Sequence, residues 1–139
     1  MRVPYTPLVE AAINEYAETP EDRLTVLMEH EKAGATIIYP KTNELQIDID
    51  TESGYAQFLA TLDLIDNKFG VKDTEILPSR SGLPHRHIVV TLHTNISDRT
   101  RVALQACLGS DPKREILAIY RIENNLPHAT CLFQYEEKK

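Results

Sequence analysis

Long hydrophobic runs are absent from this sequence. The opening stretch, MRVPYTPLVEAAINEYAETPED, interrupts its apolar residues with acids and therefore does not have the pattern of a signal peptide. No other stretch approaches the roughly 20 apolar residues that a membrane-spanning helix requires. We therefore expect a cytoplasmic protein that is not bound to a membrane.

Cysteine and positive charge are also scarce. Cys107 and Cys131 lie far apart and lack the spacing of metal ligands, which favours a reducing compartment. Fifteen lysines and arginines stand against 21 aspartates and glutamates, so the formal net charge is −6. This charge argues against a broad basic surface that coats duplex nucleic acid, but it permits a local anion site around a metal ion.

The chain has 139 residues, of which 42% are hydrophobic and 26% are charged. This length supports one domain with a core and is too short for two domains of ordinary size. No internal repeat or low-complexity linker divides the sequence. We predict a single domain over residues 1–139.

Residues 1–33 have the pattern of two helices. The second begins at TPED, where Thr19 can cap the helix, Pro20 fits its first turn and Asp22 favours its dipole. The first has apolar residues at helical spacing, which are Leu8, Val9, Ala12, Ile13 and Tyr16. We expect an N-terminal helical pair in front of the main core.

Residues 35–135 alternate strand-like and helix-like stretches. ATIIYP and NELQIDID read as a hairpin joined by the turn PKTN. One helix is expected from Tyr55 to about Gly70, a second over residues 97–108, and a third from Pro112 onward. TEIL, HRHIVVTLH and ATCLFQYE are further expected strands, and the loop PSRSGLPH separates the first two of them.

This order predicts an α+β fold of the ferredoxin-like type. A β-α-β-β-α-β core, the split βαβ plan that RRM-like folds also use, forms an antiparallel sheet with helices on one face. The hairpin strand and the N-terminal helices are additions to that core. The other sheet face is then free to bind a ligand, although base stacking is disfavoured because its central strands offer no aromatic residues.

Strand alternation places acids and histidines on this free face. The residues expected to face the helices are Leu45, Ile47, Ile49, Ile88, Val90 and Leu92. Those expected to face away are Gln46, Asp48, Asp50, His85, His87, Val89, Thr91 and His93. If the two strands are neighbours in the sheet, aspartates and histidines converge on one surface.

Asp48 and Asp50 therefore form a candidate metal site. Carboxylates about 7 Å apart along a strand can bind an oxygen-seeking divalent cation such as Mg²⁺ or Mn²⁺, which in turn can hold a nucleoside triphosphate. A histidine would contact the phosphate or orient the ion. The alternative is a solvated strand surface, because alternation produces polar outer faces in many sheets.

Three stretches together support a resemblance. LQIDID, then SRSGLPHRHIVV, then the aspartate of LGSDPKRE resemble the catalytic core of the archaeo-eukaryotic primase superfamily, particularly plasmid and phage primase-polymerases. The resemblance covers about residues 35–135. It implies that Asp48, Asp50 and Asp111 bind two metal ions, although Asp111 before Pro112 can also serve as a helix N-cap.

The same resemblance implies nucleotide contacts. His87, or alternatively His85, would touch the phosphate of the incoming nucleotide. The implied nucleotide loop contains Ser79, Arg80, Ser81 and Gly82. Further candidate phosphate or template contacts are Arg86, Lys113, Arg114 and Arg121, and scattered surface cations are the other interpretation of these four.

The implied activity is a metal-dependent nucleotidyltransferase in phage or plasmid DNA replication. Its partners would be a nucleoside triphosphate and a single-stranded DNA template. The chain lacks the accessory helical or zinc-bearing regions with which such enzymes hold template and primer. A replication helicase or another protein partner would then supply that grip.

Two alternatives remain open. Rolling-circle replication and relaxase endonucleases of the HUH type place a His-x-His strand on a ferredoxin-like sheet, which here would be His85 and His87, with Tyr120 as nucleophile. Against this, Tyr120 shares an apolar helix face with Ile116 and Ile119, where a core position is expected. The other alternative is a noncatalytic protein that binds a nucleotide or a partner through a degenerate primase-like fold.

Overall fold

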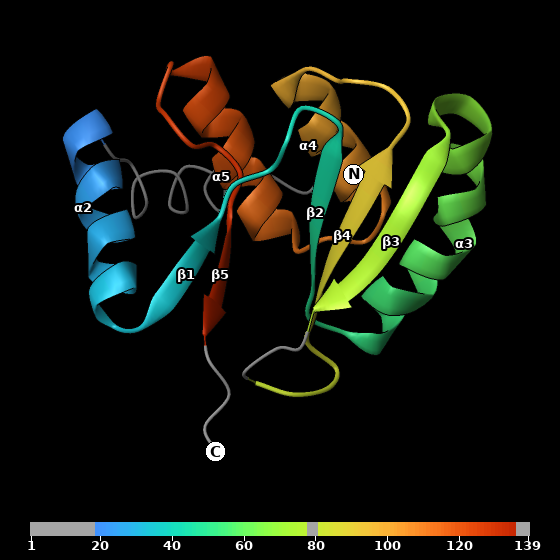
Figure 1. Ribbon diagram of the computed structural model, residues 1–139, viewed down its shortest axis with the longest axis horizontal. Coiled ribbons are helices and arrows are strands. Elements are labelled where there is room, and N and C mark those ends of the chain that lie inside the picture. The colour runs from blue at the N-terminus through green and yellow to red at the C-terminus, as the bar shows by residue number, and fades with distance from the viewer. Residues whose placement is uncertain (1–18, 78–80, 136–139) are drawn as a thin grey trace, which may run out of the picture.

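The computed structural model of the protein describes residues 19–77 and 81–135 (Figure 1). Its helices are α2 (Pro20–Lys32), α3 (Glu52–Phe69), α4 (Asp98–Cys107) and α5 (Pro112–Glu123). Its strands are β1 (Ala35–Ile38), β2 (Glu44–Ile49), β3 (Val71–Leu77), β4 (Arg86–Leu92) and β5 (Leu132–Tyr135). The expected second N-terminal helix is confirmed as α2. The expected first one lies outside the described residues.

Local signals fix the ends of these helices. Thr19 accepts a hydrogen bond from the Asp22 backbone, and the Asp22 carboxylate accepts one from the Thr19 backbone, which completes a capping box at α2. Helix α3 ends at Gly70, whose φ of +72° suits glycine. Among residues 19–77 and 81–135, no helix combines the length and apolar character needed to cross a bilayer.

The strands form two separate antiparallel sheets, so the fold is α+β. One sheet has the order β2-β4-β3 and the other pairs β1 with β5. The predicted hairpin of β1 with β2 is therefore wrong, because β1 pairs with the distant β5 from Ala35 opposite Tyr135 to Ile38 opposite Leu132. In a four-stranded ferredoxin-like sheet, β5 would lie beside β2, and here it does not.

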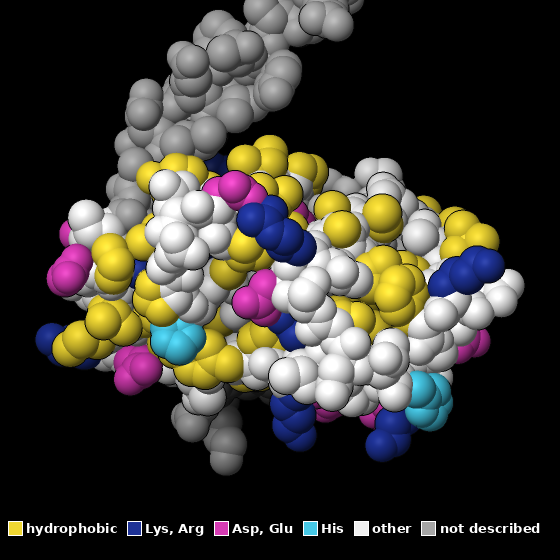
Figure 2. Space-filling model, turned by 90° about the horizontal axis from the view of Figure 1, so that it is seen from above, with side chains coloured by type: hydrophobic (Ala, Val, Ile, Leu, Met, Phe, Trp, Pro, Cys, Tyr) yellow, Lys and Arg dark blue, Asp and Glu magenta, His cyan; other side chains and the backbone are white. Residues whose placement is uncertain are grey.

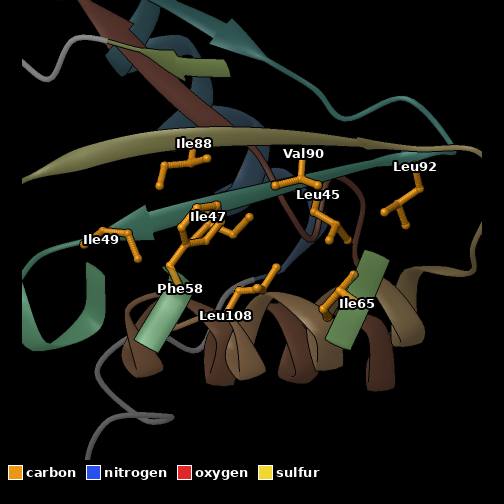
Figure 3. Close-up of a cluster of buried hydrophobic side chains, with 9 residues drawn as sticks. All are labelled: Leu45, Ile47, Ile49, Phe58, Ile65, Ile88, Val90, Leu92 and Leu108. Carbon is orange, nitrogen blue, oxygen red and sulfur yellow. The ribbon is translucent and has the colours of Figure 1, made fainter. Parts of the chain in front are cut away.

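The hydrophobic core lies on one side of the three-stranded sheet. Figure 3 shows β2 and β4 directing apolar side chains toward Phe58 and Ile65 of α3 and toward Leu108. The strand residues of this cluster are fully buried, and they are Leu45, Ile47, Ile49, Ile88, Val90 and Leu92. The predicted inward set is thus confirmed. Burial of each such side chain contributes roughly 1.5–3 kcal/mol of transfer free energy.

The outer edge of β2, away from β4, is occupied by the α4–α5 segment instead of a strand. Arg101 donates to the Glu44 carbonyl at 2.8 Å, and Arg114 donates to the Gln46 carbonyl at 2.7 Å. The backbone N–H of Gln46 donates to the side chain of Gln105 at 2.8 Å. Because these groups satisfy the free strand edge, no further strand is needed there.

The second sheet and α2 form a smaller layer beside this edge (Figure 1). Arg23 of α2 is buried and donates to the His128 carbonyl at 2.8 Å and to the Cys131 sulfur at 3.3 Å. His30 stacks on Phe133 with ring centroids 3.9 Å apart, and its Nδ1 lies 2.9 Å from the Tyr135 hydroxyl. These contacts fix α2 against β5.

Two expectations about exposure are wrong. Gln46 was expected on a free face but is fully buried, since its amide donates to the Ile38 carbonyl at 2.9 Å at the junction of the two sheets. Ile116 and Ile119 were expected in the core but are 41% and 49% exposed. They lie on α5 away from Glu115 and Ala118, the residues that α5 buries. Helical periodicity identified an apolar face of α5 that is not the face packed against the rest of the described chain.

Candidate metal centre

The register of β2 and β4 brings aspartates and histidines together. Asp48 lies opposite His87 in the ladder, and their Oδ1 and Nε2 atoms are 3.6 Å apart. One step further along, Asp50 follows the end of β2 and its Oδ1 lies 3.1 Å from Nδ1 of His85. The expected convergence of these residues is therefore confirmed, with each histidine beside one carboxylate.

A third acid reaches the same place from the turn between α4 and α5. The Asp111 backbone N–H donates to the Asp48 carbonyl at 2.7 Å, which ties the start of α5 to β2. Carboxylate oxygens of Asp48, Asp50 and Asp111 all lie within 4.8 Å of one another. Asp111 is also the N-cap of α5, because its side chain accepts from the Lys113 N–H at 3.1 Å. The expected N-cap role of Asp111 is thus confirmed, and the same carboxylate lies near those of Asp48 and Asp50.

The surroundings of Asp48 disfavour its charged form. Burial raises the pKa of Asp48 above its ordinary value, and the charges of Asp50 and Asp111 raise it further. His87 and Arg114 act in the opposite direction. Three carboxylates held together against this cost form a hard-oxygen donor set, and such a set fits Mg²⁺ or Mn²⁺.

A pocket of about 500 Å³ adjoins the cluster, with Asp48 and Asp111 in its wall. Successive turns of α5 contribute Lys113, Leu117 and Arg121 to the pocket, and β5 contributes the wall opposite them. Arg23 and Arg114 add two further cations. Pockets of this volume accommodate small organic ligands, and the grouped cations favour an anionic one.

The face of the molecule seen from above is not broadly basic. Figure 2 shows acidic and basic side chains interspersed over the upper surface, with no single basic patch on that face. The cations that line the pocket beside Asp48 give the described chain a place where an anion can be held.

The nucleotide loop expected from the sequence is described in part. Ser81 lines the pocket, and Gly82 has a φ of +72° in the turn that leads to His85. Ser79 and Arg80 lie outside the described residues. The loop therefore reaches the pocket through at least one of its members.

Two of the expected phosphate-binding arginines, Arg114 and Arg86, are engaged in structural contacts. Arg114 donates to the Cys131 carbonyl at 3.1 Å and to Glu115 at 2.7 Å, in addition to its bond to β2, so it joins α5 to β2 and to the residue before β5 while lining the pocket. The guanidinium of Arg86 lies 3.8 Å from the centroid of the Tyr55 ring and near the Glu52 carboxylate. Arg86 is thus directed toward the start of α3.

The sequence analysis did not identify four of the residues that line the pocket. They are Arg23, Cys131, Phe133 and Tyr135. Arg23 and Cys131 are 108 positions apart in the sequence, and their meeting depends on the pairing of β1 with β5. No spacing in the sequence indicates that α2 contributes to a site built around β2.

No protein-family model matches the chain, and no curated protein or solved structure matches it. The functional interpretation therefore rests on the geometry and chemistry of the site.

Proposed function

We propose that the protein is a metal-dependent nucleotidyltransferase of the primase-polymerase type. The observation that carries this proposal is the position of three carboxylates, Asp48, Asp50 and Asp111, within 4.8 Å of one another beside a cation-lined pocket. A nucleotidyltransferase needs both features, because a triphosphate must be neutralised and held next to the ions at which transfer occurs.

In this proposal the three aspartates hold Mg²⁺ or Mn²⁺. The bound cations supply charge neutralisation at the triphosphate and a more acidic attacking hydroxyl. The reaction joins the 3′-hydroxyl oxygen of a growing strand to the α-phosphorus of a nucleoside triphosphate, the hydroxyl proton passes to solvent, and the bond to the leaving pyrophosphate breaks. The template would be single-stranded DNA, held with the help of a replication helicase or another protein partner.

The remaining side chains of the site bind and orient the substrate. Ser81, Lys113 and Arg121 line the pocket and offer hydrogen-bond donors to phosphate oxygens. His87 also lines this pocket, with 18% of its side chain exposed, and in this proposal it contacts a phosphate there. The apolar pocket residues Leu117 and Phe133 offer a surface for the less polar part of the nucleotide.

The fold supports this proposal through the arrangement of its three-stranded sheet. The order β2-β4-β3, with α3 connecting β2 to β3, is the order that a split βαβ core has in its first three strands. We propose that the chain is a variant of that core in which β5 pairs with β1. The pocket then lies between α5 and the displaced β5.

The HUH alternative has weaker support than the nucleotidyltransferase. His85 and His87 each lie beside a different aspartate. Within the described residues, the group close enough to bind one metal ion consists of three aspartates and includes neither histidine. Tyr120, the nucleophile of that alternative, is not among the residues described around the pocket.

The proposal is tested by nucleotide incorporation on a primed DNA template with Mg²⁺ or Mn²⁺. Asp48→Ala and Asp50→Ala should each abolish incorporation while leaving the circular dichroism spectrum unchanged. Asp63→Ala, which removes an exposed carboxylate on α3, is the matched control and should retain activity. Full incorporation by a purified Asp48→Ala or Asp50→Ala variant would refute the assignment.

Titration calorimetry separates the enzyme from a noncatalytic binding protein. The unaltered protein should bind Mn²⁺, and a nonhydrolysable nucleoside triphosphate should bind only in its presence. Binding of both without incorporation on any template would favour the noncatalytic alternative. Binding of neither would leave the aspartates as a solvated strand face.

A further inference from the structure

Two glycines from different parts of the chain meet beside the carboxylate cluster. Gly54 lies in the first turn of α3, and Gly109 lies in the turn between α4 and α5. A Cβ on Gly109 would overlap the backbone oxygen of Gly54, and a Cβ on Gly54 would lie 3.0 Å from the oxygen of Gly109. Gly109 also has a φ of +82°, which disfavours residues with a side chain. At position 109, only glycine therefore permits the two backbones to approach this closely.

The contact between Gly54 and Gly109 joins the two segments that carry Asp50 and Asp111. Asp50 comes shortly before α3, and Asp111 comes two residues after Gly109. The backbone contact between Gly54 and Gly109 therefore sets the distance between the start of α3 and the start of α5. It supplies a constraint in addition to the hydrogen bond from the Asp111 N–H to the Asp48 carbonyl.

Ser110, between Gly109 and Asp111, fixes the same turn against β2. Its Oγ accepts from the Asp48 N–H at 3.0 Å and donates to the Glu115 carboxylate at 2.7 Å. Ser110 and Glu115 are 3% and 2% exposed. Glu115 also accepts from Gln105 at 2.8 Å, so the serine is held by a buried polar network.

We propose that Gly109 and Ser110 are positioning residues that deliver Asp111 to the proposed metal site. This inference rests on the proposed function, since it assigns the glycine crossing and the serine a role in metal affinity. Because the backbone beside Asp111 is fixed, Asp111 has fewer conformations available, and its carboxylate is held near those of Asp48 and Asp50. Outer partners that fix metal-ligating side chains change metal affinity when they are removed.

The test measures Mn²⁺ affinity by titration calorimetry for Gly109→Ala and Ser110→Ala. Both folded variants should bind Mn²⁺ roughly 10–100-fold more weakly than the unaltered protein. Gly34→Ala is the matched control, because Gly34 has a φ of +98° but nothing within 4 Å of its added Cβ. It carries the same kind of backbone strain away from the site and should bind Mn²⁺ with unchanged affinity.

Amide hydrogen exchange gives a second reading that needs no metal. The Asp111 N–H should exchange faster in Gly109→Ala and Ser110→Ala than in the unaltered protein, because its bond to the Asp48 carbonyl is no longer held in place. If Gly109→Ala does not fold, Ser110→Ala carries the test, since it removes the hydrogen bonds to Asp48 and Glu115 but introduces no overlap with the backbone of Gly54.

The outcomes separate this inference from the proposed function. Unchanged Mn²⁺ affinity and unchanged Asp111 exchange in Ser110→Ala would overturn the positioning role even if the unaltered protein incorporates nucleotides. An equal loss of affinity in Gly34→Ala would overturn it as well. Weakened Mn²⁺ binding in both variants of a protein that incorporates no nucleotide would support the positioning role and reject only the nucleotidyltransferase.

Discussion

Replacement of Asp48 with asparagine is expected to stabilise the metal-free protein at neutral pH. The Asp48 side chain is 25% exposed, and carboxylate oxygens of Asp50 and Asp111 lie within 4.8 Å. Two unit charges at that separation repel by about 3.5 kcal/mol at an effective dielectric constant of about 20 and by about 1 kcal/mol in bulk water. Attraction to His87 and Arg114 offsets part of this cost. We expect Asp48→Asn to raise the free energy of unfolding by about 1–2 kcal/mol.

The pH dependence of this gain follows from the raised pKa of Asp48. Between the ordinary pKa of aspartate, about 3.9, and the raised value, the folded state binds more protons than the unfolded state. The unaltered protein therefore loses stability as pH rises through that window, and the full penalty is present above it. The difference in free energy of unfolding between Asp48→Asn and the unaltered protein should therefore decrease as pH falls from 7 toward 4.

Urea unfolding in EDTA, followed by circular dichroism between pH 4.5 and 8, measures this effect. Asp63→Asn is the control, because its carboxylate is exposed on α3, and its stability should follow that of the unaltered protein. A metal-free Asp48→Asn variant that is less stable than the unaltered protein at pH 7 would refute the reasoning. So would an advantage of equal size at every pH.

Added Mn²⁺ should reverse the order of stability. A ligand at 100 times its dissociation constant stabilises the folded state by about 2.7 kcal/mol. The unaltered protein should gain this increment and overtake Asp48→Asn, which has lost a metal ligand. The cluster would then show the trade-off between stability and activity that is known from other functional sites, in which the arrangement needed for activity lowers the free energy of unfolding.

Three further predictions concern stability and the pocket. Arg101→Ala should lower the free energy of unfolding by about 2–3 kcal/mol in urea titrations, because the carbonyls of Glu44 in β2 and of Lys41 before it lose their donor. The exposed Arg99→Ala should change it by less than about 0.5 kcal/mol. Ile47→Ala should lower the free energy of unfolding by about 2–5 kcal/mol, because Ile47 is fully buried, and Ile116→Ala should lower it by less than about 0.5 kcal/mol. Equal losses of stability in the two variants, measured by thermal unfolding, would contradict the described packing. Leu117→Trp should fill the pocket and abolish nucleotide binding in calorimetry while leaving Mn²⁺ affinity unchanged; a variant that binds nucleotide normally would place the nucleotide elsewhere.

Local patterns predicted the elements well. The Thr19 cap and the breaks at Gly70 and Pro112 marked helix ends correctly, because these signals act within a few residues of the chain. The inward residues of β2 and β4 followed from the two-residue period of a strand. The same period placed Asp48 and His87 on one face, and the structure confirms that they meet.

Strand pairing was predicted less well. The hairpin of β1 with β2 was expected from their closeness in sequence, yet the β2 edge is taken by Arg101, Gln105 and Arg114. Each of these side chains comes from a helix more than 50 positions away from its partner in β2. Competition between a nearby strand and distant polar side chains for the same backbone groups cannot be judged from the spacing of residues in one segment.

The sequence by itself determined the described helices, the strands and the face of the sheet on which Asp48 and His87 lie, because these properties depend on neighbouring residues. Only the tertiary structure decided that the α4–α5 segment closes the β2 edge. That choice brings Asp111 within 4.8 Å of the other carboxylates and leaves β5 to pair with β1. The pocket arises from the same choice, since α5 and β5 are its walls. The physical reason is that a free strand edge must find hydrogen-bond partners, and any part of the folded chain can provide them.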